Sequence, residues 1–221
     1  MGIISLEKTS HLYWLGRYSE RAFTTVRTFM EAYDTMLDAN PLAYKKVCLQ
    51  LMIPDVYDSK EVFVTKYLFD AEDPNSIFTT LTRAYDNAMV MRDVLSSSTL
   101  AYIQMALDVL TELKNKPFNL LDLQSVLDYL YAFWGSIDDC VNSSASRNIM
   151  RFGRQVERLD LYIRLDYDKK HINWAFDRMT YRLGRAQIDY DTYNLQVVSD
   201  AVKLDRDLNK VLYNLNNIFK G

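Results

Sequence analysis

The chain has 221 residues, of which 49% are hydrophobic and 25% charged, so it is long enough to bury a substantial core. Its formal net charge of -3 and isoelectric point near 5.5 argue against general nucleic-acid binding, which requires a clustered basic surface. The sequence has no apolar run long enough to cross a membrane, and its first ten residues lack a signal-like apolar core. We therefore expect a cytoplasmic protein with neither nucleic acid nor membrane as a partner.

Residues that interrupt helices are scarce. Only six glycines and four prolines occur in the chain, which favours long helices over strands and hairpins. The two cysteines, Cys48 and Cys140, belong to no CxxC motif and have no neighbouring histidine, so neither a disulfide framework nor a zinc site is expected. The fold class predicted from these observations is all-α.

Apolar residues recur at spacings of three and four along most of the chain, the period of an amphipathic helix. The predicted helices, in chain order, span residues 6–39, 42–52, 62–69, 74–95, 100–113, 119–141, 147–165, 171–186 and 192–219. Asp58 with Glu61 is predicted as a capping box, and Asp73 with Pro74 as the N-cap and first residue of the next helix. Because the connections are short and no linker divides the chain, we expect residues 1–221 to form one compact up-and-down bundle.

One heptapeptide pattern, apolar-Gly-Arg-x-x-Glu-Arg, occurs twice, as Leu15–Arg21 and again 137 residues later as Phe152–Arg158. The flanking apolar positions also correspond, so both copies lie in the same phase of a helix. Gly16 and Gly153 flank the apolar stripe, where a missing side chain lets another helix or a ligand approach. An internally repeated Gly-Arg-x-x-Glu-Arg helix is thus the most specific feature of the sequence.

The charged residues of each copy are spaced to project together, on the flank away from the apolar seam. They are Arg17, Glu20 and Arg21 in the first copy and Arg154, Glu157 and Arg158 in the second. Guanidinium forks bind carboxylates or phosphates, and a glutamate can orient the fork or accept a ligand amine. Two alternatives remain open: a solvated face with ion pairs inside each helix, and a structural Arg–Glu lattice that joins the two halves.

Additional arginines continue this pattern. Arg147 and Arg151 precede Arg154 and Arg158 at spacings of four and three, and Arg178, Arg182 and Arg185 follow on the next predicted helix. Two facing arginine stripes would line a cleft for anions, unless Glu157, Asp160, Asp177 and Asp189 neutralise them. No nucleotide-binding, metalloprotease, hydrolase or di-iron motif occurs, so no cofactor or metal site is expected and autonomous catalysis is disfavoured.

Several segments together resemble the bacterial alpha-E helical family, a group described as a domain of unknown function. They are His11–Ala22, Asp73–Ile77, Arg83–Ala88, Val90–Asp93 and Phe152–Asp160. The resemblance covers residues 1 to about 165, and residues 166–221 are predicted as additional helices of the same bundle. The chain departs from the family in its shorter second half and around Ala101–Tyr102, where a Trp-Glu pair is expected. The resemblance adds Arg83 and Asn87 as candidate site residues.

Members of this family are commonly encoded beside circularly permuted ATP-grasp ligases and transglutaminase-like peptidases, which implies a system that modifies peptides or amide bonds. We therefore expect an accessory protein that binds an anionic small molecule or peptide carboxylate, with such a ligase or peptidase as partner. The first alternative is an enzyme of amide chemistry, with Glu20 or Glu157 as general base. The second is a structural module or homo-oligomer in which the repeat forms a seam.

Overall fold

The computed structural model describes residues 4–204 and 206–221, and within these ranges the chain is helical and contains no β-strand. The α-helices are α1 (Leu6–Asp38), α2 (Tyr44–Leu51), α3 (Lys60–Phe69), α4 (Ile77–Val90), α5 (Ser97–Leu113), α6 (Leu123–Cys140), α7 (Ser144–Arg164), α8 (Lys169–Ala186), α9 (Thr192–Lys203) and α10 (Leu212–Asn216). Two 3-10 turns, η1 (Leu120–Asp122) and η2 (Leu208–Val211), precede α6 and α10. The predicted all-α class is confirmed.

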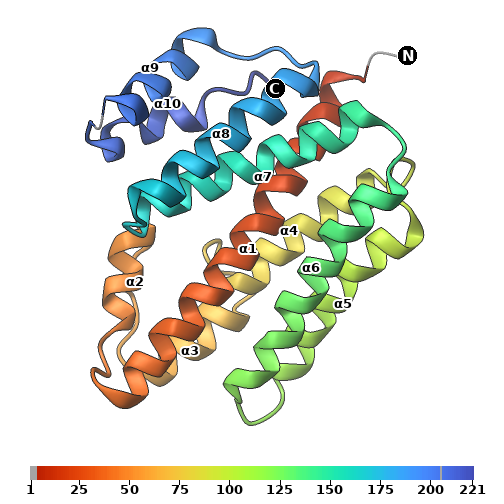
Figure 1. Ribbon diagram of the computed structural model, residues 1–221. Coiled ribbons are helices and arrows are strands. Elements are labelled where there is room, and N and C mark those ends of the chain that lie inside the picture. Colours follow the sequence, from red (N-terminus) through yellow and green to blue (C-terminus); the bar gives the residue numbers. More distant parts are fainter. Residues whose placement is uncertain (1–3, 205) are drawn as a thin grey trace.

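The longest helix, α1, lies at the centre of the molecule (Figure 1). It crosses α7, which packs in turn against α8, while α4 packs against α1 as well. The hairpin of α5 and α6 lies on one side, α2 and α3 lie near the C-terminal end of α1, and α9 with α10 covers the far side of α7 and α8 (Figure 1). Since α1 has neighbours on several sides, some of its polar residues, including Ser19, Glu20 and Thr24, are buried.

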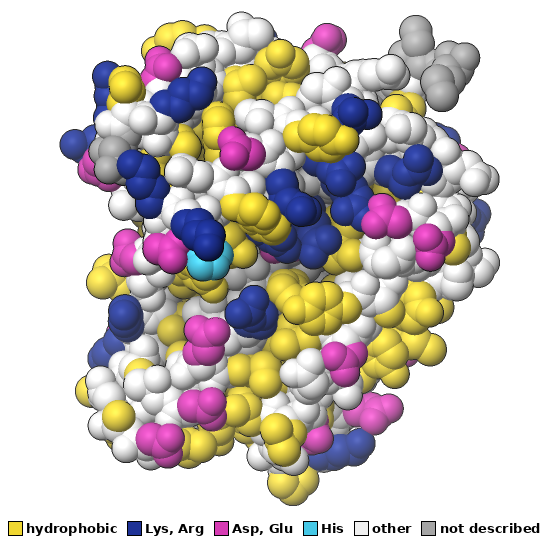
Figure 2. Space-filling model, viewed as in Figure 1, with side chains coloured by type: hydrophobic (Ala, Val, Ile, Leu, Met, Phe, Trp, Pro, Cys, Tyr) yellow, Lys and Arg dark blue, Asp and Glu magenta, His cyan; other side chains and the backbone are white. Residues whose placement is uncertain are grey.

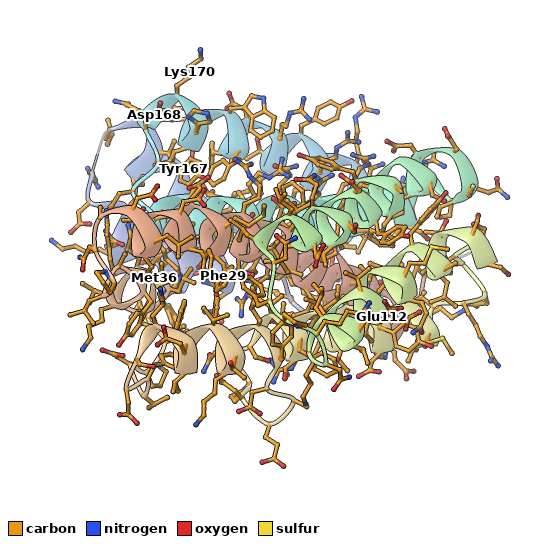
Figure 3. The ribbon with its side chains drawn as sticks, turned by 90° about the horizontal axis from the view of Figure 1, so that it is seen from below. Phe29, Met36, Glu112, Tyr167, Asp168 and Lys170 are labelled. Atoms are coloured by element: carbon orange, nitrogen blue, oxygen red, sulfur yellow. The ribbon has the colours of Figure 1, made fainter. Side chains whose placement is uncertain are left out.

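The core beside the C-terminal half of α1 is aromatic. Phe29 is fully buried, and its ring centroid lies 5.9 Å from that of Phe63 and 6.3 Å from that of Tyr67, both on α3. Figure 3 shows Phe29 and Met36 pointing from α1 toward α3, whereas Tyr167, at the turn between α7 and α8, lies on the opposite side of α1. Burying rings of this size stabilises the fold and holds α1 in place between two layers.

Several helices begin at serine N-caps, at positions that differ from the predicted helix starts. Ser59, rather than Asp58, caps α3 by accepting a hydrogen bond from the Val62 amide at 3.3 Å, and Ser76, rather than Asp73, caps α4. Asp73 instead accepts the Asn75 amide at 2.8 Å within the preceding turn. In the same way Ser143 caps α7, so this helix begins at Ser144, inside a segment that was predicted to be a loop. A serine hydroxyl satisfies an otherwise unpaired amide in each case.

The prediction of one helix over residues 192–219 is wrong. The chain leaves α9 after Lys203 and turns at η2, where the Asp207 side chain accepts the Asn209 amide at 3.1 Å. The chain then returns as α10, which packs against α9 and α7. The same apolar spacing continues across the break, but the reversal lets apolar residues of both arms, such as Val198 and Leu215, be buried within the bundle. It also carries the last residues of the chain back to α1.

Candidate functional site

The two copies of the repeat meet where α1 crosses α7. A Cβ atom on Gly16 would collide with the carbonyl oxygen of Met150 and lie 2.9 Å from its carbonyl carbon. A Cβ atom on Gly153 would collide in the same way with the carbonyl of Tyr13. Tyr13 and Met150 are themselves equivalent positions of the repeat, 137 residues apart, so the contact is approximately two-fold symmetric. Glycine is required here because the two backbones touch.

This close approach turns the charged residues of each copy toward the other helix. The Glu157 carboxylate of α7 accepts hydrogen bonds from Nε of Arg17 at 2.6 Å and from Nε of Arg21 at 2.5 Å, both on α1. Both oxygens of Glu157 are used. The second copy therefore supplies a carboxylate to both arginines of the first.

The reverse arrangement also occurs. The Glu20 carboxylate of α1 accepts Nε of Arg154 at 2.8 Å, Nε of Arg158 at 2.5 Å and Nη2 of Arg158 at 2.9 Å. We call these six residues, Arg17, Glu20, Arg21, Arg154, Glu157 and Arg158, the Glu–Arg clasp. Each half of the clasp holds the other, so the ion pairs join helices that are far apart in sequence.

The clasp corrects the prediction that these side chains project away from the seam. The side chains of Glu20 and Glu157 are each 1% exposed, and that of Arg17 is 4% exposed, whereas Arg21 keeps 39% of its side chain exposed. Of the two structural alternatives, ion pairs within one helix and an Arg–Glu lattice between the halves, the clasp has the second, because its pairs form between helices. The reason is the missing side chains at the crossing, which bring α1 and α7 close enough for flank positions to become internal.

Charge balance favours the ionised forms of Glu157 and Arg17 despite their burial. Burial opposes the charged form of Glu157, but the charges of Arg17 and Arg21 outweigh it, so the pKa of Glu157 is lowered. Burial is also the largest single effect at Arg17, but the charges of Glu157, Tyr13 and Asp160 and the hydrogen bond to Glu157 together outweigh it and raise the pKa of that guanidinium. Removing one partner would leave an uncompensated buried charge, which is far more costly than losing an exposed ion pair.

The C-terminal segment extends the clasp. Nη2 of Arg17 donates to Oδ1 of Asn216 at 2.6 Å, and Nδ2 of Asn216 donates to Oδ1 of Asp160 at 2.7 Å. Asp160 also accepts Nε of Arg164 at 2.6 Å. The sequence had suggested Asp160 only as a neutraliser of the arginine stripe, and Asn216 not at all, because no local pattern distinguishes an asparagine that becomes buried through a chain reversal.

Each of the three tryptophans in the chain lies against an arginine of the clasp. The guanidinium carbon of Arg154 is 4.2 Å from the ring centroid of Trp134. The corresponding distances are 5.1 Å between Arg17 and Trp14 and 5.5 Å between Arg158 and Trp174. Cation–π contacts fix the planes of the guanidinium groups and shield them from water. No pattern in the sequence pairs these tryptophans with the arginines of the clasp.

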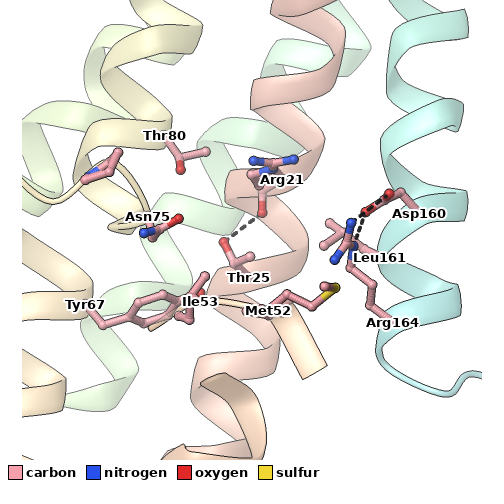
Figure 4. A pocket seen from close by; sticks show the side chains of 12 residues that line it. Arg21, Thr25, Met52, Ile53, Tyr67, Asn75, Thr80, Asp160, Leu161 and Arg164 are labelled. Carbon is pink, nitrogen blue, oxygen red and sulfur yellow. Dashed lines mark hydrogen bonds and ion pairs between the residues drawn. The ribbon is translucent and has the colours of Figure 1, made fainter. Parts of the chain in front are cut away.

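Beside the clasp lies a cavity of about 340 Å³, which we call the first cavity. Arg21 lines it from α1, and Asp160, Leu161 and Arg164 line it from α7 (Figure 4). Its opposite wall consists of the segment after α2 and of residues around α4, namely Leu51, Met52, Ile53, Pro74, Asn75 and Thr80. Arg21 uses its Nε for Glu157, and no described residue accepts a hydrogen bond from its two Nη groups. The first cavity therefore offers guanidinium donors next to an apolar wall.

Two predicted site residues of α7 lie outside the clasp. Arg147 donates to the carbonyl oxygens of Val141 and Asn142, at the C-terminal end of α6, and Arg151 pairs with Asp138 of α6. Cations are favourable at this end of a helix. These two arginines therefore fasten α7 to α6 rather than extending the clasp.

The two candidates on α4 are likewise placed elsewhere. Arg83 donates to the Pro74 carbonyl at 3.3 Å, and its guanidinium carbon lies 5.8 Å from the Tyr18 ring. Asn87 donates to the Arg83 carbonyl at 2.7 Å and bonds to the His11 ring at 2.9 Å. Neither lines the first cavity. They attach α4 to the first turns of α1.

The arginines of α8 do not face those of α7 across a cleft. Arg178 lies over Trp174 at 4.4 Å, Arg185 lies over Tyr181 at 4.6 Å, and Arg182 donates to Asn148 at 3.1 Å. Figure 2 shows Lys and Arg side chains gathered near the centre of this face of the molecule. The result is an arginine–aromatic surface rather than two opposed stripes.

Among the described residues, no group of His, Cys, Asp or Glu side chains could hold a metal ion. No helix in residues 4–204 and 206–221 is both long enough and apolar enough to pass through a lipid bilayer.

The sequence of the chain matches the model of a known family. The model of the Alpha-E family, a predicted alpha-helical domain with a conserved ER motif, matches residues 8–198, and the chain belongs to this family. The match extends beyond residue 165, where the sequence resemblance had been placed. The dipeptide Glu-Arg occurs in this chain at positions 20–21 and 157–158, which are the two halves of the clasp. Searches of curated proteins and of solved structures each found no significant match.

Proposed function

We propose that the chain is an accessory ligand-binding protein that holds a carboxylate or phosphate group in the first cavity, with Arg21 as the main anion-binding residue. The observation that carries this proposal is the unequal exposure within the clasp. Glu157 is buried and fully paired, whereas its partner Arg21 is 39% exposed and lines the cavity. A guanidinium held in place by a buried carboxylate is a preorganised anion site.

The remaining lining suits a ligand with both polar and apolar parts. Asn75 and Thr80 provide hydrogen-bonding groups on the side opposite Arg21, and Leu51, Ile53 and Leu161 provide apolar surface. Small-molecule sites commonly combine apolar walls with a few polar groups that fix orientation. An acidic side chain or terminal carboxylate of a peptide has this character, as do other organic acids of similar size.

Binding is better supported than autonomous catalysis. A general base needs a pKa near the working pH and a free lone pair directed at the substrate. The pKa of Glu157 is instead lowered, and both of its oxygens accept arginine donors. Glu20 has the same kind of pairing with Arg154 and Arg158. Both carboxylates therefore serve to hold arginines.

The family resemblance extends the proposal to a system that modifies peptides or amide bonds. In that setting the chain presents a carboxylate-bearing substrate to an ATP-grasp-type ligase or to a transglutaminase-like peptidase, and the partner supplies the chemistry. Arg21 and the first cavity account for recognition of the acid group. The partner itself is proposed from the resemblance alone.

A thermal-shift experiment tests the proposal, because a ligand that binds the folded state raises its apparent stability. The probes are succinate, inorganic phosphate and N-acetyl-glutamyl-glutamate, added to the wild type, to Arg21→Lys and to Arg158→Lys. The last variant is the matched control, because Arg158 occupies the equivalent position of the repeat but does not line the first cavity. We expect a shift for the wild type and Arg158→Lys that is lost in Arg21→Lys. Equal loss in both variants, or no shift with any probe, would overturn the proposal.

A purely structural role is the second candidate, and the reciprocal clasp with its glycine contact favours it. Under this alternative the arginine variants lower the melting temperature and no probe raises it. The same experiment separates the two, since the stability of each variant is measured without probe before binding is scored.

A further inference from the structure

A second cavity, of about 270 Å³, lies against the other half of the clasp, between α1, α6 and the turn from α7 to α8. Five residues that line it correspond to five that line the first cavity, each pair separated by 137 residues. The pairs are Arg21 and Arg158, Leu161 and Thr24, Thr25 and Tyr162, Asp160 and Phe23, and Arg164 and Arg27. The duplicated helix has thus formed two related cavities, one on each side of the crossing.

The lining of the second cavity has become aromatic. Phe23 and Tyr162 stand where the first cavity has Asp160 and Thr25, and Tyr131 and Tyr167 are added from neighbouring elements. Phe23 and Tyr131 meet edge to face, with centroids 4.8 Å apart. Tyr162 and Tyr167 stack at 4.3 Å with an interplanar angle of 9°. Ring pairs from different elements therefore border the space.

The same cavity carries an excess of positive charge. Arg27, Arg154 and Arg158 line it together with a single carboxylate, that of Glu20. Arg154 gives only its Nε to Glu20, and Arg158 gives Nε and Nη2, while no described residue accepts a hydrogen bond from their other nitrogens. Arg27 has a distant ion pair, at 3.9 Å from Glu31, and lies 6.0 Å from the Phe23 ring centroid, but no described residue accepts a hydrogen bond from it. Several guanidinium donors are therefore available to a ligand.

We propose that the second cavity binds a small aromatic acid, whose single ring packs against the tyrosines while its carboxylate or phosphate is held by Arg27 and Arg158. Aromatic walls favour a flat π system, and the guanidinium forks favour an anion with two or more oxygens. The volume of about 270 Å³ lies just below the range of about 300–1,000 Å³ of drug-sized sites, which suits a one-ring ligand. This inference goes beyond the ligand proposed for the first cavity and does not depend on it.

Isothermal titration of the full chain with 4-hydroxyphenylacetate and with phenyl phosphate tests the proposal. Acetate and inorganic phosphate, which have the anion but no ring, are the matched probes. The variants are Arg27→Gln, which removes a cavity arginine outside the clasp, and Tyr131→Ala, which removes a ring that is 56% exposed. Tyr213→Ala is the control, because Tyr213 is a 75% exposed tyrosine on α10.

We expect both aromatic acids to bind the wild type and the control equally, and each cavity variant to weaken binding by about tenfold, the loss expected for one charge-assisted contact or one ring contact. Bound ligand should also change the tryptophan fluorescence, because Trp134 and Trp174 contact Arg154 and Arg158, which line this cavity; Trp134→Phe and Trp174→Phe should each reduce that signal. Arg21→Lys should leave the affinity unchanged, which separates this site from the first cavity. Absence of binding at millimolar concentration, equal binding of acetate, or indifference to both cavity variants would overturn the proposal.

Discussion

Arg17 of α1 donates its Nε to Glu157 of α7 across 2.6 Å, although 140 residues separate the two in the chain. Through the approximate two-fold relation of the repeat, Arg154 donates to Glu20 at 2.8 Å in the same manner. Two helices that carry the same sequence pattern here complete each other, much as two subunits of a symmetric dimer do. Each Glu-Arg dipeptide can therefore be buried without an unpaired charge only because the other copy supplies its partners.

Alanine at Gly16 or Gly153 should strongly destabilise the fold. The new methyl group would meet backbone atoms of Met150 or Tyr13, which cannot move aside as a flexible side chain could. We expect each substitution to lower the free energy of unfolding by about 2 kcal/mol or more, measured by urea denaturation.

Two other helical glycines provide the control for this experiment. A Cβ atom on Gly135 of α6 or Gly184 of α8 would meet nothing within 4 Å. Alanine at either site should therefore stabilise the protein by roughly 0.5–1 kcal/mol, because alanine has the higher helix propensity. If all four substitutions changed the free energy of unfolding in the same direction, the close crossing of α1 and α7 would be incorrect.

Glu157→Gln should cost about 3–5 kcal/mol, because it leaves Arg17 and Arg21 without their buried counter-charge. Glu20→Gln should behave similarly on the other half of the clasp. Glu112→Gln is the comparison, since Glu112 pairs with Lys116 at 3.0 Å on the surface, where both side chains are more than half exposed. Its effect should stay within about 0.5 kcal/mol, and a clasp variant as mild as this one would argue against a buried ion-pair network.

Much of the helical framework follows from local patterns. The first helix was predicted to span residues 6–39 and spans Leu6–Asp38, because one apolar stripe and the Asn40–Pro41 stop are both local signals. The C-terminal break was missed because Leu204, Leu208 and Val211 keep the helical period through it. There the tertiary contacts of α10 override a periodicity that would equally fit one continuous helix.

The candidate site likewise has features that local patterns predict and others that depend on tertiary contacts. All six residues of the clasp were identified as candidates from their repeated spacing. Spacing, however, predicts only which residues share a face of a helix and does not predict which other helix packs against that face. Whether the copies face each other depends on how the helices between them fold back, which no local pattern records. The stacking of Trp134 on Arg154 was hidden for the same reason.

Asn216 should contribute to stability more than its neighbour Asn217. Its side chain joins Arg17 to Asp160, at 2.6 and 2.7 Å, and so fastens α10 to the clasp. Asn216→Ala should cost about 1–3 kcal/mol, because hydrogen bonds to charged groups are lost and buried partners are left unpaired. The Asn217 side chain only bonds back to the Tyr213 carbonyl at an exposed position, so Asn217→Ala should change little. Equal effects of the two variants in thermal unfolding would contradict this role.

The clasp should also make stability depend on pH in the acid range. In the folded protein the pKa of Glu157 lies below its ordinary value of 4.5, because Arg17 and Arg21 outweigh the effect of burial. As the pH falls, the unfolded chain therefore takes up the proton first, and the stability that Glu157 provides is complete at neutral pH but declines from about pH 5 downward. Urea denaturation of the wild type and of Glu157→Gln, from pH 7 to pH 3, measures this contribution as the difference between their free energies of unfolding. That difference should shrink as the solution becomes more acidic; a constant difference down to pH 3 would mean that Glu157 titrates alike in both states, which the pairing of this buried carboxylate with two guanidinium groups does not allow.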